Sequence, residues 1–535
     1  MPEFMISAPQ PEAVEAGLDI FKRGGNVVDA AIAAAMVQTV VDPQMCGIAG
    51  FGSMQLLLKE RKEHLFIDFH GKAPKAVSQD MWESLVDREC DDGFGFVLKD
   101  KVNEIGYKSM TTPMTLKAFD KAVQSYGRLS LEHIMQPAIN YCFDGFQVRP
   151  AVHRFWLQPA QAGRIERVEV IKKFKTARDI YLKNDKLLNV GDNLKNLDMG
   201  RLYEKIANEG VDIFYKGDVA EIIDADMKAN GGLITKADLA DCEPNLTAPL
   251  LGTYRDYEIA TNQMPGGGLM IIEMLNILEN FDLKSMGHNS AEYIACVAEA
   301  MKCATIDKDT LMGDQNYLDV PVKKLSSKGY AARMASKIFS GEKFDVPRVN
   351  SGMQESKETT HLVAADKKGN IVNLTHSLGS SSGVITEGLG FMYNNCMMVF
   401  DPRPGKPGSL APGKSRFTAM CPTVISHNGE PKLALGAPGG TTITMGVLQT
   451  ILNVVDFNMN AQHAVTAPRF CATSNLLELT NRIFRSVEAE LIAKNYAIIR
   501  YPSSYITPLV HAIRFANGTM DGGADPAGDG MFASV

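Results

Sequence analysis

Closely spaced cysteine pairs are absent from this sequence of 535 residues. Its nine cysteines are scattered, their number is odd, and no two of them have Cys-x-x-Cys spacing. A disulfide framework or a cysteine-based zinc site would need such spacing. The ten histidines form no His-x-x-x-His or Glu-x-x-His pattern that would indicate a metal site. The sequence therefore predicts free thiols in a reducing compartment, and neither a metal nor a cofactor.

A long apolar run is also missing. The longest, Ala30 to Val41, is too short and too rich in alanine to span a bilayer. No secretory signal is visible, because Met1 to Phe4 is short and polar and a first strand is expected directly after it. The sequence thus predicts a cytoplasmic protein without a membrane partner. A periplasmic or secreted location is the alternative if a signal peptide has been removed.

The sequence also has no excess of basic residues. The formal net charge is -7, and lysine and arginine are dispersed along the chain. This balance argues against nucleic acid as a partner. With 45% hydrophobic and 22% charged residues, the composition is that of a soluble globular protein. The length suffices for two or more domains, or for one large interlocked domain.

The start of the chain predicts helices packed on buried strands. Apolar positions at helical spacing favour helices over 11–23 and 27–41, and the second is apolar almost all round, so it should be buried. Asn26 can cap that second helix. Strands are expected over 53–58 and 63–69. This order of elements is typical of a layered α/β protein.

The most informative stretch runs from Thr359 to Thr375. It contains one apolar strand, a charged turn with Gly369-Asn370, and a second apolar strand, so it predicts a β-hairpin. The chain before it, from about 113 to 350, shows mostly helical patterns. After it strands dominate until a helix expected over 441–452.

Several motifs, taken in order along nearly the whole chain, resemble the gamma-glutamyltranspeptidase family. Together they are far more specific than any one of them alone. They are Gly24-Gly25-Asn26-Val27-Val28-Asp29-Ala30-Ala31, Ile67-Asp68-Phe69 with Ala73-Pro74, Phe214-Tyr215-Lys216-Gly217, Asn230-Gly231-Gly232-Leu233-Ile234-Thr235, Asn276-Ile277-Leu278-Glu279-Asn280-Phe281-Asp282, Thr359-Thr360-His361 and Gly436-Ala437-Pro438-Gly439-Gly440.

The resemblance implies a fold and a self-cleavage. Members of the family are α/β (α+β) proteins, built as a four-layer α-β-β-α sandwich of the N-terminal-nucleophile hydrolase type. They cut their own chain before the first threonine of the Thr-Thr-His run, which here is the bond between Glu358 and Thr359. Residues 1–358 would form the large subunit and 359–535 the small catalytic subunit. Both are expected to remain one interlocked domain.

The resemblance also implies catalytic residues. Thr359 would be the nucleophile, because the α-amine freed by cleavage, with a pKa of about 8, can take the proton of its hydroxyl. That hydroxyl would attack the carbonyl of a small-molecule amide, and water or an amine would resolve the acyl-enzyme. Backbone N–H groups of Gly439 and Gly440 would bind the oxyanion at the start of the following helix. Ser377 would support the amine.

The residues that bind the γ-glutamyl group in the family are largely replaced. The arginine that clamps the α-carboxylate is His70 here, and histidine lacks a permanent bidentate charge. The aspartate that pairs with the α-ammonium aligns with Val399, although a two-residue slip would bring Asp401 to that position. The other expected binding positions also differ from the family, and they are Gly379, Cys396, Thr418 and Ala419.

These replacements change the predicted substrate. Each charge-assisted hydrogen bond is worth on the order of 1.5–3 kcal/mol, so several losses together could abolish glutamyl selectivity. A carboxyacyl amide without the α-ammonium, such as a glutaryl or oxamyl amide, would fit, with His70 or Lys72 as the partner of its carboxylate. Two alternatives stay open. One is an ordinary gamma-glutamyltransferase acting on glutathione-like donors, and the other is an unprocessed, catalytically silent member of the family.

A further motif, Gly379-Ser380-Ser381-Ser382-Gly383, matches the Gly-x-Ser-x-Gly elbow of serine hydrolases. That elbow requires a strand before it and a helix after it. Residues 384–390 do not have a helical pattern, so a glycine-serine loop that lines the pocket is the better interpretation.

Overall fold

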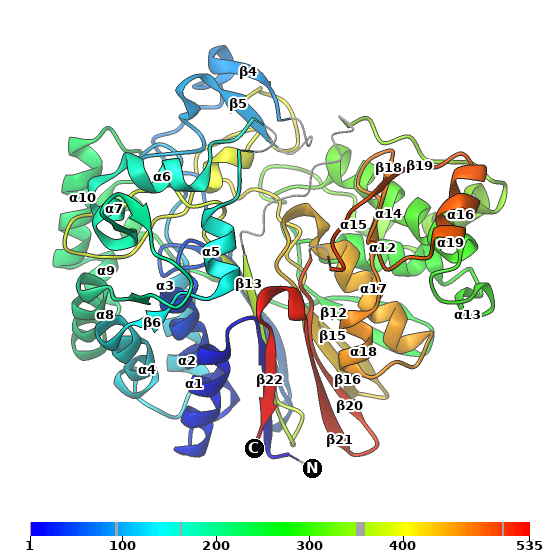
Figure 1. Ribbon diagram of the computed structural model, residues 1–535, viewed down its shortest axis with the longest axis horizontal. Helices are drawn as coiled ribbons and strands as arrows, with labels where there is room; N and C mark the ends of the chain where they lie inside the picture. Colours follow the sequence, from blue (N-terminus) through cyan, green and yellow to red (C-terminus); the bar gives the residue numbers. More distant parts are fainter. Residues whose placement is uncertain (1, 91–94, 161–162, 349–358, 506–507) are drawn as a thin grey trace.

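The computed structural model describes residues 2–90, 95–160, 163–348, 359–505 and 508–535 (Figure 1). The predicted cleavage site lies at one of these boundaries, since Thr359 is described and Glu358 lies outside the described residues. The two ends of the chain lie side by side (Figure 1), because the N–H of Phe4 donates to the carbonyl of Val535 at 3.2 Å.

Two antiparallel sheets form the centre of the molecule. The first has seven strands in the order β10 (Asn245–Thr247), β3 (Glu63–Phe69), β2 (Phe51–Leu58), β14 (Ile371–Ser377), β13 (Thr360–Asp366), β1 (Phe4–Ala8) and β22 (Met531–Ser534). The second has six strands in the order β11 (Leu250–Tyr254), β12 (Tyr257–Thr261), β15 (Thr423–His427), β16 (Glu430–Gly436), β20 (His511–Ala516) and β21 (Thr519–Ala524).

Helices cover the outer face of each sheet (Figure 1). The first sheet carries α1 (Pro11–Lys22), α2 (Val27–Val41), α3 (Thr115–Tyr126), α4 (Leu131–Asp144) and α8 (Leu197–Glu209). The second carries α12 (Gly268–Leu278), α14 (Ala291–Leu311), α16 (Lys328–Phe339), α17 (Ile443–Val455), α18 (Ala461–Thr466) and α19 (Arg485–Ala493). Buried apolar side chains join each helical layer to its sheet, and a smaller cluster fills the space between the sheets. The predicted four-layer α-β-β-α sandwich is confirmed.

Shorter elements surround these layers. Those before the predicted cleavage site are β4 (Val86–Glu89), β5 (Phe96–Leu98), β6 (Phe146–Gln147), α5 (Pro150–Trp156), α6 (Arg167–Lys173), α7 (Lys175–Tyr181), β7 (Leu182–Lys183), β8 (Lys186–Leu187), β9 (Asn193–Leu194), α9 (Asp212–Tyr215), α10 (Asp218–Ala229), α11 (Lys236–Ala240), α13 (Leu283–Met286) and α15 (Val322–Leu325). Those after it are β17 (Phe470–Cys471), β18 (Leu476–Leu479) and β19 (Ala497–Arg500).

The predicted hairpin after Thr359 is β13 and β14. Alternate side chains of a strand point to opposite faces of the sheet. Leu362 and Ala364 accordingly join the core under the helices, whereas Val363 and Ala365 join the cluster between the sheets. β13 pairs with β14 on one side and with β1 on the other, so it lies inside the sheet and not at its edge.

Both sheets contain strands from the two sides of the predicted cleavage site. In the first sheet β1, β2, β3 and β10 precede Thr359, and β13, β14 and β22 follow it. In the second sheet β11 and β12 precede it and the other strands follow. The hydrogen bonds that join these strands do not depend on the bond before Thr359. A cut chain would therefore stay in one piece, although the division into 1–358 and 359–535 is itself still a prediction.

Polar side chains connect the two sheets. Asn373 of β14 donates from Nδ2 to the carbonyls of Thr423 and Leu435, at 3.0 Å each. Gln55 of β2 donates from Nε2 to the carbonyl of Ala260 at 3.1 Å. Because buried polar groups require partners, these bonds restrict how one sheet can slide over the other.

Other expectations for the elements are also met. The predicted helices over 11–23 and 27–41 are α1 and α2, and every residue of α2 is buried. The predicted strands are β2 and β3, and the helix expected over 441–452 is α17. All nine cysteines are free and buried. Within the described ranges, no helix combines the length and the apolar character that crossing a bilayer requires.

The N-terminus of α2 is held by a reciprocal capping box. Asn26 accepts the N–H groups of Val28 and Asp29 on its Oδ1, at 2.8 and 3.0 Å. Asp29 in turn accepts the N–H of Asn26 at 2.8 Å. Asn26 also donates from Nδ2 to the carbonyl of Tyr126 at 2.7 Å, which ties α2 to α3. The glycine-asparagine motif of the sequence thus has a structural role.

Replacing Asn26 by alanine should lower the free energy of unfolding by about 1–2 kcal/mol, because the first turn of a buried helix loses its side-chain acceptor. Denaturant titration would measure the change. Asn26→Ser is the matched control, since its hydroxyl can still cap the helix, and it should lose less. Equal stability of Asn26→Ala and the wild type would contradict the role of the cap.

Candidate active site

Thr359 lies directly before β13, and only 8% of it is exposed. The register of the hairpin pairs Thr360 with His376, so Thr359 lies opposite Ser377, the last residue of β14. Thr359 donates from Oγ1 to Ser377 Oγ at 3.1 Å, and Ser377 Oγ also accepts the N–H of Gly379 at 2.9 Å. The hairpin therefore holds the hydroxyl of the predicted nucleophile in one orientation.

A buried network anchors the start of β13 from the other side. Thr360 Oγ1 accepts from the side-chain amides of Gln10 and Gln38, at 3.0 and 3.1 Å. Gln38 of α2 also bonds to Gln10 at 2.6 Å and to the ring of His376 at 2.9 Å. The strand that begins with the predicted nucleophile is thus fixed to the helical layer through side chains as well as through its backbone. No pattern in the sequence pointed to these two glutamines.

A cavity opens beside Thr359. It brings together most of the residues predicted for the site, although they come from five separate parts of the second half of the chain. Those that line it are Thr359, Ser377, Gly379, Cys396, Val399, Thr418, Ala419 and Gly440. The rest of the lining is Arg164, Asn395, Met398, Arg416, Phe417, Met420, Thr441 and Ile443. We refer to it as the acyl cavity.

The charged residues of the acyl cavity are Arg164 and Arg416, and no carboxylate side chain is among its lining residues in the described chain. The guanidinium of Arg416 lies over the ring of Phe51, 5.0 Å from its centroid. Its buried Nε has no hydrogen-bond partner among the described residues. The described lining is therefore suited to an anionic group and offers no carboxylate to an ammonium.

His70 is not among the residues that line the acyl cavity. It is buried, and its Nδ1 is bonded to the carboxylate of Asp68, two residues earlier. The cations beside the cavity are thus the two arginines and not the predicted histidine. Arg416 lies two residues before Thr418 and could have been found by that proximity. Arg164 is remote from every motif, and no sequence signal pointed to it.

The structure also separates Val399 from Asp401. Val399, at the end of the short 3-10 helix η4 (Cys396–Val399), lines the cavity. Asp401 does not line it, because Arg403 holds both of its carboxylate oxygens, at 2.9 and 2.8 Å. The two-residue slip considered for the sequence would therefore not supply an acid to the acyl cavity.

Gly439 and Gly440 form the turn between β16 and the helical segment that starts with η5 (Gly440–Thr442) and continues as α17. Their φ values of 149° and 58° lie in the region that favours glycine. A Cβ on Gly439 would lie only 2.8 Å from the Cα of Pro508. Gly440 lines the acyl cavity, whereas Gly439, the other residue predicted for the oxyanion, does not. N–H groups at the start of a helix have no acceptor in the preceding turn, which suits them to an oxyanion.

The Gly-x-Ser-x-Gly segment is a loop, as predicted. No helix follows it, and Gly379 lines the acyl cavity. Thr359, by contrast, has the setting that a nucleophile needs, with a bonded hydroxyl and space beside it.

A second cavity also includes Thr359 in its lining. Its charged residues are Asp42, Arg149 and Arg154. Burial raises the pKa of Asp42 to about 6, and Arg149 nearby opposes the rise. Arg154 is exposed and donates to the carbonyl of Ala527 at 2.8 Å. The sequence did not predict this cavity, because its lining comes from several distant segments. Thr359 thus lines two separate cavities.

Comparisons with known proteins found a matching family model and similar sequences. A family model described as "Gamma-glutamyltranspeptidase" matches residues 13–535. The chain is 35% identical to the "Acylase ACY 1 proenzyme" of Pseudomonas sp. (strain SE83), over 99% of this chain and 93% of that protein. It is 34% identical to the "Glutathione hydrolase proenzyme" of Escherichia coli (strain K12), over 87% of this chain and 80% of that protein.

A solved structure shows the same architecture over the whole chain. The cephalosporin acylase from Bacillus halodurans superposes with a TM-score of 0.87, at 25% sequence identity, over 99% of this chain and 96% of that one. The resemblance inferred from the sequence motifs is therefore confirmed, and so is the fold that it implied.

Replacing Ser377 by alanine should slow self-cleavage at Thr359 by about 2- to 13-fold, because a hydrogen bond of this kind contributes about 0.5–1.5 kcal/mol. The fraction of cut chain at fixed times after cell-free synthesis would measure the rate. Ser377→Thr keeps an acceptor and should restore most of it. A wild-type rate in Ser377→Ala would show that this hydroxyl does not assist Thr359.

Proposed function

The chain belongs to the gamma-glutamyltranspeptidase family, and from this premise we propose that it is a self-processing amide hydrolase or acyltransferase with Thr359 as its nucleophile. The observation that carries the proposal is the position of Thr359. Its hydroxyl is bonded to Ser377 at the start of a central strand, between two cavities. The relatives with the printed names acylase proenzyme and glutathione hydrolase proenzyme support it.

The hydroxyl of Thr359 would also carry out the self-cleavage of the chain. Thr359 Oγ1 attacks the carbonyl of Glu358, the C–N bond breaks, and the nitrogen that is released becomes the α-amine of Thr359. Water then hydrolyses the ester, which leaves a carboxylate on the first fragment and restores the hydroxyl. The new amine is a base with a pKa of about 8, so the mature enzyme carries its own proton acceptor beside the nucleophile.

Turnover of an amide uses the same atoms. The hydroxyl of Thr359 attacks the substrate carbonyl, the amine accepts its proton, and that proton passes to the leaving nitrogen as the C–N bond breaks. N–H groups at Gly439 and Gly440 stabilise the negative oxygen of the tetrahedral intermediate. Water, or a second amine, then attacks the acyl ester. Hydrolysis and transfer therefore differ only in the nucleophile of this last step.

We assign a carboxyacyl group to the acyl cavity. Arg164 and Arg416 line this cavity, and their guanidinium groups can bind a terminal carboxylate. Val399 and Ala419 give the cavity an apolar wall where an α-ammonium would need an acid. A glutaryl-type amide satisfies both conditions, whereas a γ-glutamyl amide would bury its ammonium without a counter-charge.

The second cavity is then the place for the other half of the amide. An amide has an acyl side and an amine side, and Thr359 lines one cavity for each. Arg154 favours an amine that carries a carboxylate, whereas Arg149 is already paired with Glu12 and Asp529. Ionised Asp42 lies in the same cavity above a pH of about 6.

A second candidate function is hydrolysis of glutathione-like γ-glutamyl donors. The 34% identity to the Escherichia coli glutathione hydrolase proenzyme favours it. The absence of an acidic side chain among the described lining residues of the acyl cavity argues against it. A catalytically silent protein is the third possibility, and the processing experiment separates it from the other two.

Thr359→Ala should abolish processing, because no hydroxyl remains to attack the preceding carbonyl. On a denaturing gel the wild type should give two fragments, residues 1–358 and 359–535, and the variant a single band. Thr359→Ser keeps a hydroxyl and should still be cut, at a lower rate. Cleavage of the alanine variant would place the junction elsewhere, and an uncut wild type would favour the silent protein.

Arg416→Gln should lower kcat/KM for a glutaryl anilide by about 10- to 150-fold, since it removes a charge-assisted bond worth about 1.5–3 kcal/mol. Activity on a neutral acyl anilide of the same length should stay near that of the wild type, which controls for folding. Arg416→Lys should recover part of the loss. Preference of the wild type for γ-glutamyl anilide over glutaryl anilide would overturn the assignment of the acyl group.

A further inference from the structure

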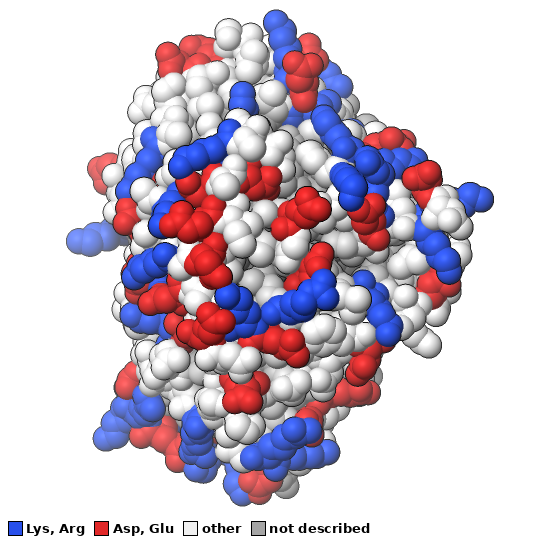
Figure 2. All heavy atoms as spheres, turned by 90° about the vertical axis from the view of Figure 1, so that its left-hand side faces the viewer, with Lys and Arg blue, Asp and Glu red and all other residues white. Residues whose placement is uncertain are grey.

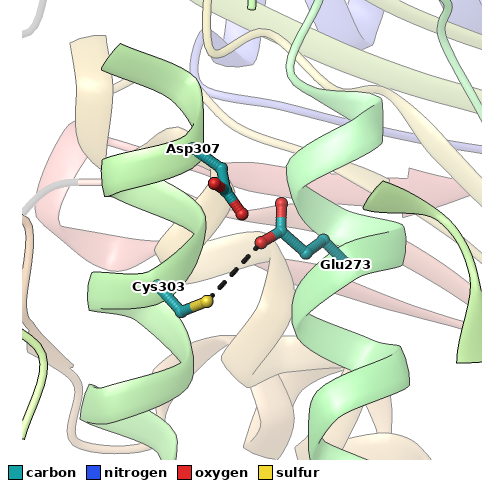
Figure 3. Close-up of side chains that lie close together, drawn as sticks. All are labelled: Glu273, Cys303 and Asp307. Atoms are coloured by element: carbon teal, nitrogen blue, oxygen red, sulfur yellow. Dashed lines mark hydrogen bonds between the residues drawn. The ribbon is translucent and has the colours of Figure 1, made fainter. Parts of the chain in front are cut away.

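Three potential metal ligands meet in the core of the second helical layer (Figure 3). They are Glu273 of α12 and Cys303 and Asp307 of α14, and all are buried. One ligand atom from each lies within 4.8 Å of the other two. Figure 3 shows the three side chains pointing toward one another between the two helices.

The helices account for this convergence. Cys303 and Asp307 are four residues apart in α14, so they lie one turn apart on the same face. Glu273 is the single charged residue of α12, whose other positions are apolar except for Asn276. Packing of α12 against α14 buries that face, and with it the acid.

The cluster has no balancing positive charge. Among the described residues, no lysine, arginine or histidine forms an ion pair with Glu273 or Asp307. Glu273 accepts a weak bond from the Cys303 thiol at 3.8 Å on one oxygen. Its other oxygen has no hydrogen-bond partner in the described chain, although the residue is fully buried. An uncompensated acid in such a place costs several kcal/mol, on the order of the penalty for any buried ion.

We propose that Glu273, Cys303 and Asp307 form a structural site for one zinc ion. A thiolate with two carboxylates is a donor set that zinc accepts, whereas magnesium and calcium select oxygen ligands alone. Tetrahedral zinc would bring the three atoms closer together by small side-chain movements, and a water molecule could complete the coordination.

A neighbouring tyrosine already orients one ligand. Tyr330 of α16 donates from its hydroxyl to a carboxylate oxygen of Asp307. Such bonds from outside the coordination sphere hold a ligand in position and are a regular feature of metal sites. Three helices of the layer would therefore meet at the ion.

The site would brace one wall of the acyl cavity. α12 begins directly after Gly267, whose N–H donates to the carbonyl of Met420 at 2.8 Å. Met420 lines the acyl cavity. A zinc ion that fixes α12 to α14 would thus stabilise the segment behind the substrate. No step of the proposed reaction passes through the ion.

Metal analysis of protein purified without chelators tests the proposal. The wild type should hold about one zinc per chain. Cys303→Ser and Glu273→Gln should weaken zinc binding by more than about tenfold, since each removes a ligand. Cys296→Ser and Glu299→Gln are matched controls, because both residues are buried in α14 but lie outside the cluster, and they should keep the metal.

Two further measurements do not depend on activity. Addition of zinc should raise the melting temperature of the metal-depleted wild type, and the Cys303→Ser and Glu273→Gln variants should not respond. Substitution by cobalt should give a thiolate-to-cobalt absorption band that disappears in Cys303→Ser. Wild-type protein without stoichiometric metal, and with a melting temperature that zinc does not change, would overturn the proposal. The acids would then be a carboxyl pair that shares a proton.

Discussion

The pairing of β13 on both of its edges is the constraint on which the rest of the site depends. β1 and β14 bond to its backbone, and the amides of Gln10 and Gln38 bond to the side chain at its first residue. Chain ends normally fray, because little holds them. Thr359 would become such an end after processing, yet the strand behind it is clamped within a buried sheet. A free amine and a positioned hydroxyl can therefore exist at one residue.

The chemistry and the specificity of this site are built from different parts of the fold. Thr359 and Ser377 belong to one hairpin, and Gly440 belongs to the turn before α17. The groups that would select a substrate come from loops and from the first half of the chain, as Arg164 and Arg149 show. Loops tolerate change better than central strands do. Because the two sets of residues lie in different parts of the fold, members of a family can keep one reaction and still accept different acyl groups.

Polar side chains hold the layers together where apolar packing alone would not define their register. Asn373 and Gln55 bond across the two sheets, and the capping box of Asn26 and Asp29 fixes α2 over the first sheet. Buried polar groups stabilise a single arrangement because every other arrangement leaves them without partners. Glu273 differs from these groups because it is a buried acid that faces a second buried acid, Asp307, and no described cation pairs with it. That difference is the reason to look for an ion beside it.

From the sequence alone, the local elements could be located and Thr359 could be predicted as the reactive residue. The period of its apolar residues located α2 and the β13–β14 hairpin, and the motif order placed Thr359, Thr418 and Val399 at one site. The tertiary structure decided which charges face the substrate: Arg416 and Arg164 line the acyl cavity, while His70 is bound to Asp68. It also revealed the second cavity and the acidic cluster. Periodicity reports short-range contacts along the chain, whereas these features arise where segments far apart in sequence pack together. Long-range packing leaves no regular pattern in the order of residues, so only the folded chain shows it.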